Sequence, residues 1–290
     1  MEQRLLDVCE KGDIVELQQL LDNPNISFNY QYKENYDRTP LHIACEKGHI
    51  EVVKLLLNDE RVDINKANKY HQTPFLIACW KGHNEIMKLL LNDNRMDVNK
   101  ANKYNRPPLY IACYNGHIDI VKLLLNDNRV DINKADKDGA TPFLIACSQG
   151  QIEIVKLLLN DVRVDVNRTV SGENFDKGEN YEEATSFWIV CRWGEIEVVK
   201  LLLNDQRVDV NKANNPGKTP FYIACQNGHI EIVKYILASG REIDINKINI
   251  NGNTALDCAR EGKDDILELI ESFERNPDKT RIKLRIQLGL

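Results

Sequence analysis

In this 290-residue sequence, several cysteines are followed four places later by a histidine, and residues of these types at this spacing could bind a metal. Thiolate and imidazole are preferred zinc ligands. The spacing occurs in four pairs: Cys45/His49, Cys79/His83, Cys113/His117 and Cys225/His229. Two further copies keep the cysteine but carry Gln151 or Glu195 in place of histidine. Because a zinc site does not lose ligands so freely, we expect no metal, and we expect these histidines to fix a turn by hydrogen bonds.

Acidic residues also recur in pairs, as paired carboxylates do in acid–base catalysis. Asp59 and Asp63 stand beside Arg61 and Lys66, and most later copies repeat the arrangement. Repeated charges with counter-ions indicate a ladder of surface ion pairs, each contributing about 0–1 kcal/mol. The sequence has no phosphate-binding glycine loop, nucleophile elbow or HExxH motif. We therefore expect no enzyme and no cofactor.

Charge and hydropathy narrow the classes of partner. The chain carries 38 Lys and Arg against 44 Asp and Glu, a formal net charge of −6, which argues against nucleic acid. No apolar run is long enough to cross a membrane. The first six residues include charges where a signal peptide requires an apolar run. We expect a monomer that binds another protein or peptide, with no nucleic-acid or membrane partner.

The elements that position these residues are internal repeats. The eight-residue string 52–59, Val-Val-Lys-Leu-Leu-Leu-Asn-Asp, recurs with small changes at 86, 120, 154 and 198, and a shorter relative begins at Ile232. These starts are evenly spaced except for the step from 154 to 198, so the array contains one ten-residue insertion. A second block, 39–45, precedes each string in similar form. A fixed period of this length is typical of repeat proteins.

Each repeat reads as two short helices followed by a hairpin. Thr39 suits an N-cap, Pro40 suits the first helical position, and Gly48 allows a tight turn after the first helix. The second helix, around 52–57, is apolar over most of its circumference and must be buried between neighbouring helices. The alternating segment 62–65 indicates a short hairpin.

This pattern resembles the ankyrin repeat family. The block 39–44, Thr-Pro-Leu-His-Ile-Ala, matches the family's first helix, 48–56 its second helix, and 63–65 its hairpin strand. The resemblance implies an all-α ankyrin-repeat solenoid with short β-hairpin loops, forming one elongated, curved domain. We expect an N-terminal capping repeat with a long loop at 1–35, six full repeats at 36–250, a C-terminal capping repeat at 251–273 and a basic tail at 274–290.

Two departures from the family stand out. Its usual repeat is one residue shorter, and the extra residue here falls after the second helix, where 58–61 replaces a shorter turn containing glycine. Three hairpin tips carry Asp37, His71 and Asn105 where the family has glycine. These residue types tolerate a positive φ better than most, so we expect the turns to survive.

The cysteines follow the repeat. Seven of the eight occupy one repeat position, and Cys258 lies one place earlier in its unit. Equivalent positions on packed neighbouring helices are about 8–10 Å apart, whereas a disulfide needs Cα atoms within about 7 Å. We therefore expect free, buried thiols and a reducing, cytoplasmic location.

The residues that vary between repeats are the candidates for function. Most Trp and Tyr lie in hairpins or first helices, which in the ankyrin family form the concave, partner-binding face, and both types are enriched at binding hot spots. We expect partner contacts from Tyr36, Tyr70, Trp80, Tyr104, Tyr110, Tyr114, Trp188, Arg192, Trp193 and Tyr222. For Tyr110, Trp188 and Tyr222 the alternative is packing between repeats, and for Tyr70 and Tyr104 it is stacking on each other.

Our main hypothesis is therefore a non-catalytic scaffold for protein–protein interaction, with a partner on the concave face. The alternative is a regulatory adaptor whose specificity lies in two charged segments. One is an acidic finger made by the insertion at about 168–184, and the other is the basic tail. The alternating segment 282–288 of the tail fits a strand or a helix equally well.

The family resemblance also implies one modification. Ankyrin hairpins can be hydroxylated on the asparagine that follows the hairpin strand. The matching residues are Asn65, Asn99, Asn133, Asn167, Asn211 and Asn246. The other role for these asparagines is to hydrogen-bond the hairpin backbone.

Overall fold

A computed structural model of the chain describes residues 1–170 and 181–290. Its regular elements are helices, and they form two compact units, unit 1 (Met1–Lys137) and unit 2 (Asp138–Leu290). Within the described residues the only antiparallel pairing is an isolated bridge between Tyr32 and Arg38. Where the structure describes them, the hairpins expected from the sequence are thus loops that end in tight turns, without regular strands.

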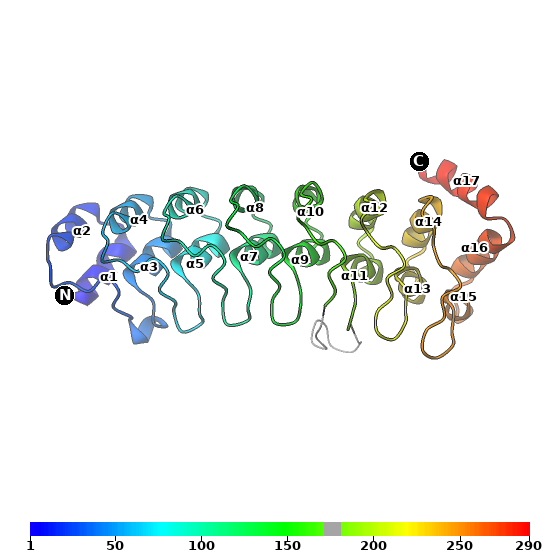
Figure 1. Ribbon diagram of the computed structural model, residues 1–290, viewed down its shortest axis with the longest axis horizontal. Helices are drawn as coiled ribbons and strands as arrows, with labels where there is room; N and C mark the ends of the chain where they lie inside the picture. The colour runs from blue at the N-terminus through cyan, green and yellow to red at the C-terminus, as the bar shows by residue number, and fades with distance from the viewer. Residues whose placement is uncertain (171–180) are drawn as a thin grey trace. The chain divides into compact units, whose positions relative to one another are not determined.

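Unit 1 consists of four helix pairs. The first helix of each pair packs on the next first helix, and each second helix packs on the next second helix, which gives the two rows seen in Figure 1. The bounds are α1 Glu2–Lys11, α2 Ile14–Leu21, α3 Pro40–Lys47, α4 Ile50–Leu57, α5 Pro74–Lys81, α6 Asn84–Leu91, α7 Pro108–Asn115 and α8 Ile118–Leu125, with a 3₁₀ turn at Lys33–Asn35. The hairpin loops project beside the first helices.

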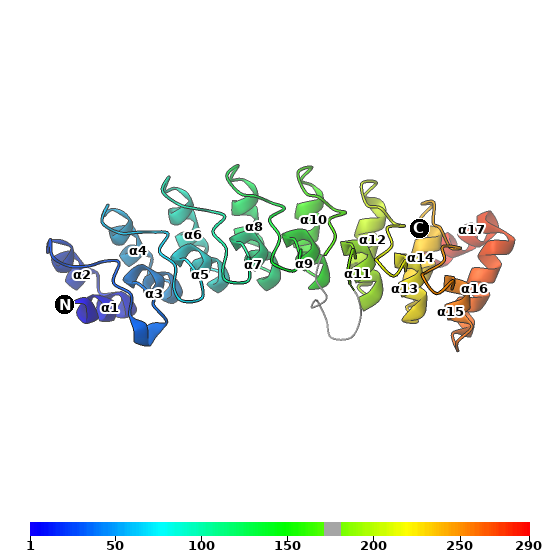
Figure 2. The same ribbon diagram turned by 60° about the horizontal axis from the view of Figure 1, so that its bottom comes forward.

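Unit 2 repeats this arrangement and ends in an additional helix. Its bounds are α9 Pro142–Ser148, α10 Ile152–Leu159, α11 Ser186–Trp193, α12 Ile196–Asn204, α13 Pro220–Gln226, α14 Ile230–Ala238, α15 Ala255–Ala259, α16 Asp264–Arg275 and α17 Pro277–Leu288. The tail that fitted a strand or a helix is the helix α17, which packs against α14 and α16. Figure 2 shows the helix pairs of each unit from a second side.

The first helices begin and end as their sequence predicts. In α5, the Thr73 hydroxyl accepts a hydrogen bond from the Leu76 backbone N–H at 3.2 Å, and Pro74 occupies the first turn. Gly82 ends the helix with φ of 79°. A Cβ on Gly82 would lie 2.9 Å from the His117 ring of the next repeat, so glycine is needed here for space as well as for conformation.

The hairpin tips keep their turns without glycine, as expected. Asp37, His71 and Asn105 have φ of 60°, 60° and 59°. In the second of these hairpins the Asn68 side-chain oxygen accepts from the backbone N–H groups of Tyr70 and Gln72, both at 2.9 Å. An asparagine that mimics a backbone turn in this way stabilises the tip.

The segment that lengthens the repeat does more than form surface ion pairs. Arg95 is bidentate on Asp93, and its Nη2 also donates to the Leu57 carbonyl at 2.8 Å, at the end of α4 in the preceding repeat. Arg61, Arg129 and Arg207 donate in the same way to Leu21, Leu91 and Leu159. Because a helix leaves its last carbonyls unpaired, the arginine caps the second helix of the neighbouring repeat. The simple charge ladder expected from the sequence was incomplete in this respect.

The hairpin asparagines also join neighbouring repeats. The Asn65 amide donates to the Arg95 carbonyl at 2.6 Å, and its oxygen accepts from the Asp97 N–H at 2.9 Å. Asn99, Asn167 and Asn211 make the same two bonds one repeat further on. These bonds give these four asparagines a structural role, and hydroxylation of the six predicted residues stays a prediction.

The cysteines are as predicted. All eight are free and buried. Burial raises the pKa of the Cys9 thiol to about 12, which keeps it protonated and unreactive at neutral pH.

Candidate functional site

The histidines of the Cys-x-x-x-His pairs are engaged with backbone, as the sequence suggested. His83 Nε2 lies 3.1 Å from the Glu46 carbonyl, and His117 Nε2 lies 3.0 Å from the Trp80 carbonyl. A carbonyl only accepts, so Nε2 carries the proton in each case. Each ring thus ties one inter-helix turn to the first helix of the preceding repeat. In the described part of the chain, no group of three or more His, Cys, Asp or Glu is placed to hold a metal ion.

Three of the aromatic residues expected to meet a partner are buried instead. Tyr110, Trp188 and Tyr222 are 2%, 0% and 5% exposed. They occupy the repeat position of His42, which is also buried between neighbouring first helices. The alternative of packing between repeats therefore holds for these three, and none of them presents a contact surface.

Trp188 and Arg192 support the base of the insertion. The Trp188 ring meets the buried Tyr181 ring edge-on at 5.6 Å, and Arg192 Nε donates to the Tyr181 hydroxyl at 2.9 Å. Two backbone bonds close the base, from Val170 N–H to the Ala184 carbonyl and from Glu183 N–H to the Val170 carbonyl. Arg192 is thus a structural residue, and Trp193 is half-buried. The rest of the acidic finger, 171–180, lies outside the described residues.

Two exposed aromatics remain on the first helices of unit 1. Trp80 near the end of α5 and Tyr114 near the end of α7 are each 47% exposed. Glu46 holds the same repeat position in α3, where it pairs with Arg38 of its own hairpin at 2.6 Å and with Lys81 at 3.3 Å. This position therefore faces the hairpins, so Trp80 and Tyr114 lie on the same side as the hairpin tips.

The hairpin tips of unit 1 carry a row of tyrosine rings and lysines, in which the rings of Tyr36 and Tyr70 also lie 5.6 Å apart. Lys69 Nζ lies 4.5 Å from the Tyr36 ring centre and 5.3 Å from that of Tyr70, and Lys103 Nζ lies 4.9 Å from the rings of both Tyr70 and Tyr104. Lys103 thus contacts both Tyr70 and Tyr104, in place of the direct stacking considered for these two rings. We call this set the tyrosine–lysine row: Tyr36, Lys69, Tyr70, Lys103, Tyr104 and Lys137, whose Nζ lies 5.5 Å from Tyr104.

Sequence reasoning found the tyrosines of this row and missed its lysines. The signal was present, because Asn68-Lys69-Tyr70 recurs one repeat later, at 102–104, as Asn-Lys-Tyr. Since the repeats stack in register, a lysine beside the tip tyrosine of one repeat lies next to the tip tyrosine of the previous one.

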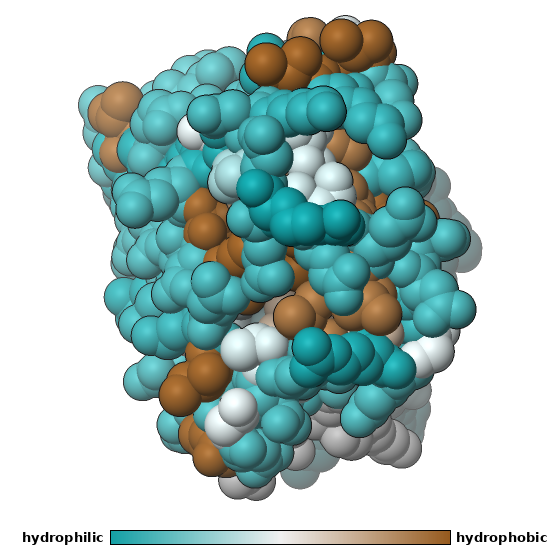
Figure 3. All heavy atoms as spheres, turned by 90° about the vertical axis from the view of Figure 1, so that its right-hand side faces the viewer, coloured by the Kyte–Doolittle hydropathy of each residue, from teal (hydrophilic) through white to brown (hydrophobic). Residues whose placement is uncertain are grey.

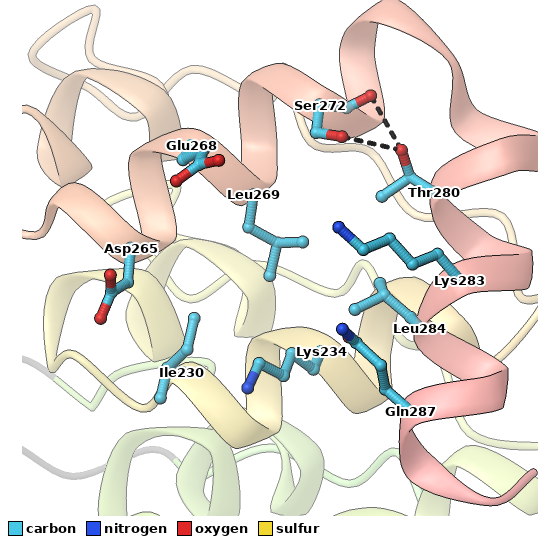
Figure 4. A pocket seen from close by; sticks show the side chains of 10 residues that line it. All are labelled: Ile230, Lys234, Asp265, Glu268, Leu269, Ser272, Thr280, Lys283, Leu284 and Gln287. Atoms are coloured by element: carbon cyan, nitrogen blue, oxygen red, sulfur yellow. Dashed lines mark hydrogen bonds between the residues drawn. The ribbon is translucent and has the colours of Figure 1, made fainter.

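Unit 2 has a shallow cavity beneath its last helix. It has a volume of about 320 Å³ and lies between α14, α16 and α17, and Figure 4 shows its lining. Thr280 spans one edge by donating to the Ser272 carbonyl at 2.9 Å, and Lys234 is paired with Glu231 at 2.7 Å. Among its polar lining residues, Lys234, Ser272 and Thr280 are thus engaged with the protein.

The outer face of α17 carries two exposed apolar side chains. Ile282 and Ile286 are 59% and 76% exposed, whereas Thr280 and Leu284 point inward and are buried. Figure 3 shows apolar atoms gathered along the top edge of that end of unit 2, where α17 lies in Figure 1. The flanking Lys279, Lys283 and Arg285 make this helix basic as well as apolar.

No helix within the described residues is long and apolar enough to span a membrane.

A search of curated proteins found no match. Among solved structures, the chain resembles the ankyrin repeat domain of Bcl-3, described as a unique member of the IkappaB protein family. The two share 22% identity and a TM-score of 0.69 over 79% of this chain and 98% of that one. At this identity the likeness concerns the fold alone. A family model described as ankyrin repeats (3 copies) matches residues 5–102, 94–170, 171–249 and 187–281. These matches, with the repeated helix pairs and their turn chemistry, show that the chain belongs to the ankyrin repeat family.

Proposed function

We propose that the chain is a non-catalytic protein-interaction scaffold whose partner binds the hairpin and first-helix side of unit 1. Ankyrin repeat proteins generally mediate protein–protein interaction. The observation that carries the proposal is the pair Trp80 and Tyr114, which are large aromatic side chains left nearly half exposed at matching places in neighbouring repeats. Neither ring is required by the scaffold, because Glu46 fills the same position in α3.

The position of these rings suits a binding surface. Trp and Tyr supply large contact areas with few rotatable bonds, so little conformational entropy is lost on binding. The first helices that present them are fixed by the packing of α3, α5 and α7 and by the bonds from His83 and His117. A partner would therefore meet a preformed surface.

The test is the double variant Trp80→Ala/Tyr114→Ala. We expect its thermal unfolding midpoint to stay close to that of the parent, because both side chains are outside the core. Its retention of a partner captured from the host lysate, quantified by mass spectrometry, should fall at least tenfold, which corresponds to about 1.4 kcal/mol.

The matched control is Val15→Ala/Ile118→Ala, which removes exposed apolar groups from the second helices α2 and α8. This control should retain the partner at the parent level. Equal retention by the Trp80/Tyr114 variant and the parent would reject the assignment of the surface.

One observation favours the alternative of an adaptor that binds through its basic tail. The Ile282 and Ile286 side chains form an exposed pair one helical turn apart, beside three cations on the same helix. The variant Ile282→Ser/Ile286→Ser leaves the buried Thr280 and Leu284 in place. If the tail is the binding site, this variant loses the partner and binding falls steeply with salt, while Trp80→Ala/Tyr114→Ala has no effect.

A further inference from the structure

The lysines of the tyrosine–lysine row have no anionic partner among the residues that the structure describes. No carboxylate within the described residues pairs with Lys69, Lys103 or Lys137, whereas Lys54 and Lys88 on the second helices are paired with Glu51 and Glu85. Each ammonium of the row instead lies against a tyrosine ring. A ring satisfies an ammonium only partly and leaves its N–H donors free to bind an anion.

The scaffold does not need these side chains. Successive tips are joined by backbone bonds, from Lys69 N–H to the Tyr36 carbonyl and from Lys103 N–H to the Tyr70 carbonyl, both at 3.1 Å. In unit 2 the same bond runs from Ile250 N–H to the Pro216 carbonyl at 3.0 Å, without tyrosine or lysine. The row is therefore a feature of unit 1 that the fold itself does not explain.

The spacing of the row limits the ligand shape. The Nζ atoms of Lys69 and Lys103 lie 5.3 and 4.9 Å from the same Tyr70 ring centre. The distance between the two ammonium groups therefore cannot exceed the sum of these two distances. Equivalent positions on packed neighbouring helices are about 8–10 Å apart. A polyproline II peptide presents every third side chain on one face, about 9 Å apart. An extended peptide with an acidic residue at every third position thus matches the row.

We propose that the tyrosine–lysine row binds an acidic, extended segment of the partner protein, with its carboxylates on Lys69, Lys103 and Lys137. This inference rests on the proposed function and names the chemistry of the partner. The phenolic hydroxyls of Tyr36, Tyr70 and Tyr104 make no hydrogen bond within the described residues and add donors along the row. Charge complementarity then supplies both affinity and register.

A protein segment fits this surface better than nucleic acid does. Single-stranded nucleic acid binds by stacking bases on aromatic faces, and here lysine ammonium groups already lie over the rings. The net charge of the chain, −6, also opposes a long polyanion. Carboxylates spaced along a peptide need only the three ammonium groups.

The test uses the full chain and a labelled twelve-residue peptide of four Glu-Pro-Ala triplets, with binding measured by fluorescence anisotropy at low and physiological salt. The Lys69→Gln/Lys103→Gln/Lys137→Gln variant should bind at least tenfold more weakly than the parent. The matched control, Lys54→Gln/Lys88→Gln/Lys122→Gln, makes the same charge change on the second helices and should bind within twofold of the parent. Equal losses in the two variants would overturn the proposal.

Three comparisons complete the test. A peptide with glutamine for every glutamate should not bind, and binding equal to that of the acidic peptide would overturn the proposal. An oligouridylate twelve-mer that binds more tightly than the peptide, through the same three lysines, would also overturn it. If the peptide fails to bind while Trp80→Ala/Tyr114→Ala still loses its captured partner, the acidic-segment inference is wrong and the proposed function stands.

Discussion

At the scale of single residues, His42 links stability to pH. It is fully buried, its Nδ1 accepts from the Thr39 backbone N–H at 3.0 Å, and its Nε2 donates to the Gln72 carbonyl at 2.9 Å. Burial lowers the pKa of His42 from 6.5 to about 4, so the unfolded chain binds a proton more readily than the folded chain between these values. The stability that depends on neutral His42 is complete above pH 6.5 and is lost as the pH falls toward 4.

His42→Leu should remove this pH dependence, since Leu76 and Leu144 already fill the same position in other repeats. Urea titrations at pH 7.5 and at pH 5 give the unfolding free energy that each protein loses between these two values. This loss should be about 2 kcal/mol smaller in the variant than in the parent. Identical losses would show that His42 is not kept neutral by the fold.

Two glycines of unit 2 allow the energetic cost of backbone strain to be distinguished from the cost of close packing. Gly217 and Gly252 have φ of 79° and 78°, but a Cβ on Gly217 would lie 3.2 Å from the Asn249 Cα, whereas Gly252 has open space. Gly252→Ala should therefore cost about 1–2 kcal/mol from conformation alone, and Gly217→Ala should cost more. Thermal unfolding of both variants measures the difference, and equal midpoints would mean that the contact has no energetic effect.

At the scale of elements, the arginine after each second helix gives the lengthened repeat a structural role. Arg95→Ala removes the bond to the Leu57 carbonyl and leaves Asp93 without its bidentate partner. We expect a loss of about 1 kcal/mol of unfolding free energy. Lys88→Ala, which breaks an exposed pair with Glu85 on α6, is the matched control and should cost only about 0.3–0.5 kcal/mol. Equal costs in urea titrations would rule out a capping role.

The local signals in the sequence were sufficient to predict the helices, but they were insufficient to predict the contacts between repeats. Thr73, Pro74 and Gly82 act within one turn of α5, so their roles follow from residue type. The bond from Arg95 to α4 joins residues 38 positions apart, and the lysine between Tyr70 and Tyr104 depends on how repeats stack. Burial of Tyr110 and Trp188 likewise depends on neighbouring helices, and their aromatic type alone favoured exposure.

At the scale of the whole molecule, the chain combines a repeated framework with a few side chains that the framework does not require. His83, Asn65 and Arg95 each bond to an adjacent repeat, and equivalents of each recur along the chain. Within 1–170 and 181–290, Trp80 and the tyrosine–lysine row make no such framework bonds through their side chains. In a repeat protein, function is expected in the residues that differ between repeats, and in unit 1 these residues gather on the hairpin and first-helix side.

The most direct test of that claim is hydrogen–deuterium exchange of the full chain with and without its captured partner. We predict that the partner slows exchange at the tips around 69–71 and 103–105 and at the ends of α5 and α7, and leaves α4, α6 and α8 unchanged. Protection confined to the second helices or to α17 would contradict the account.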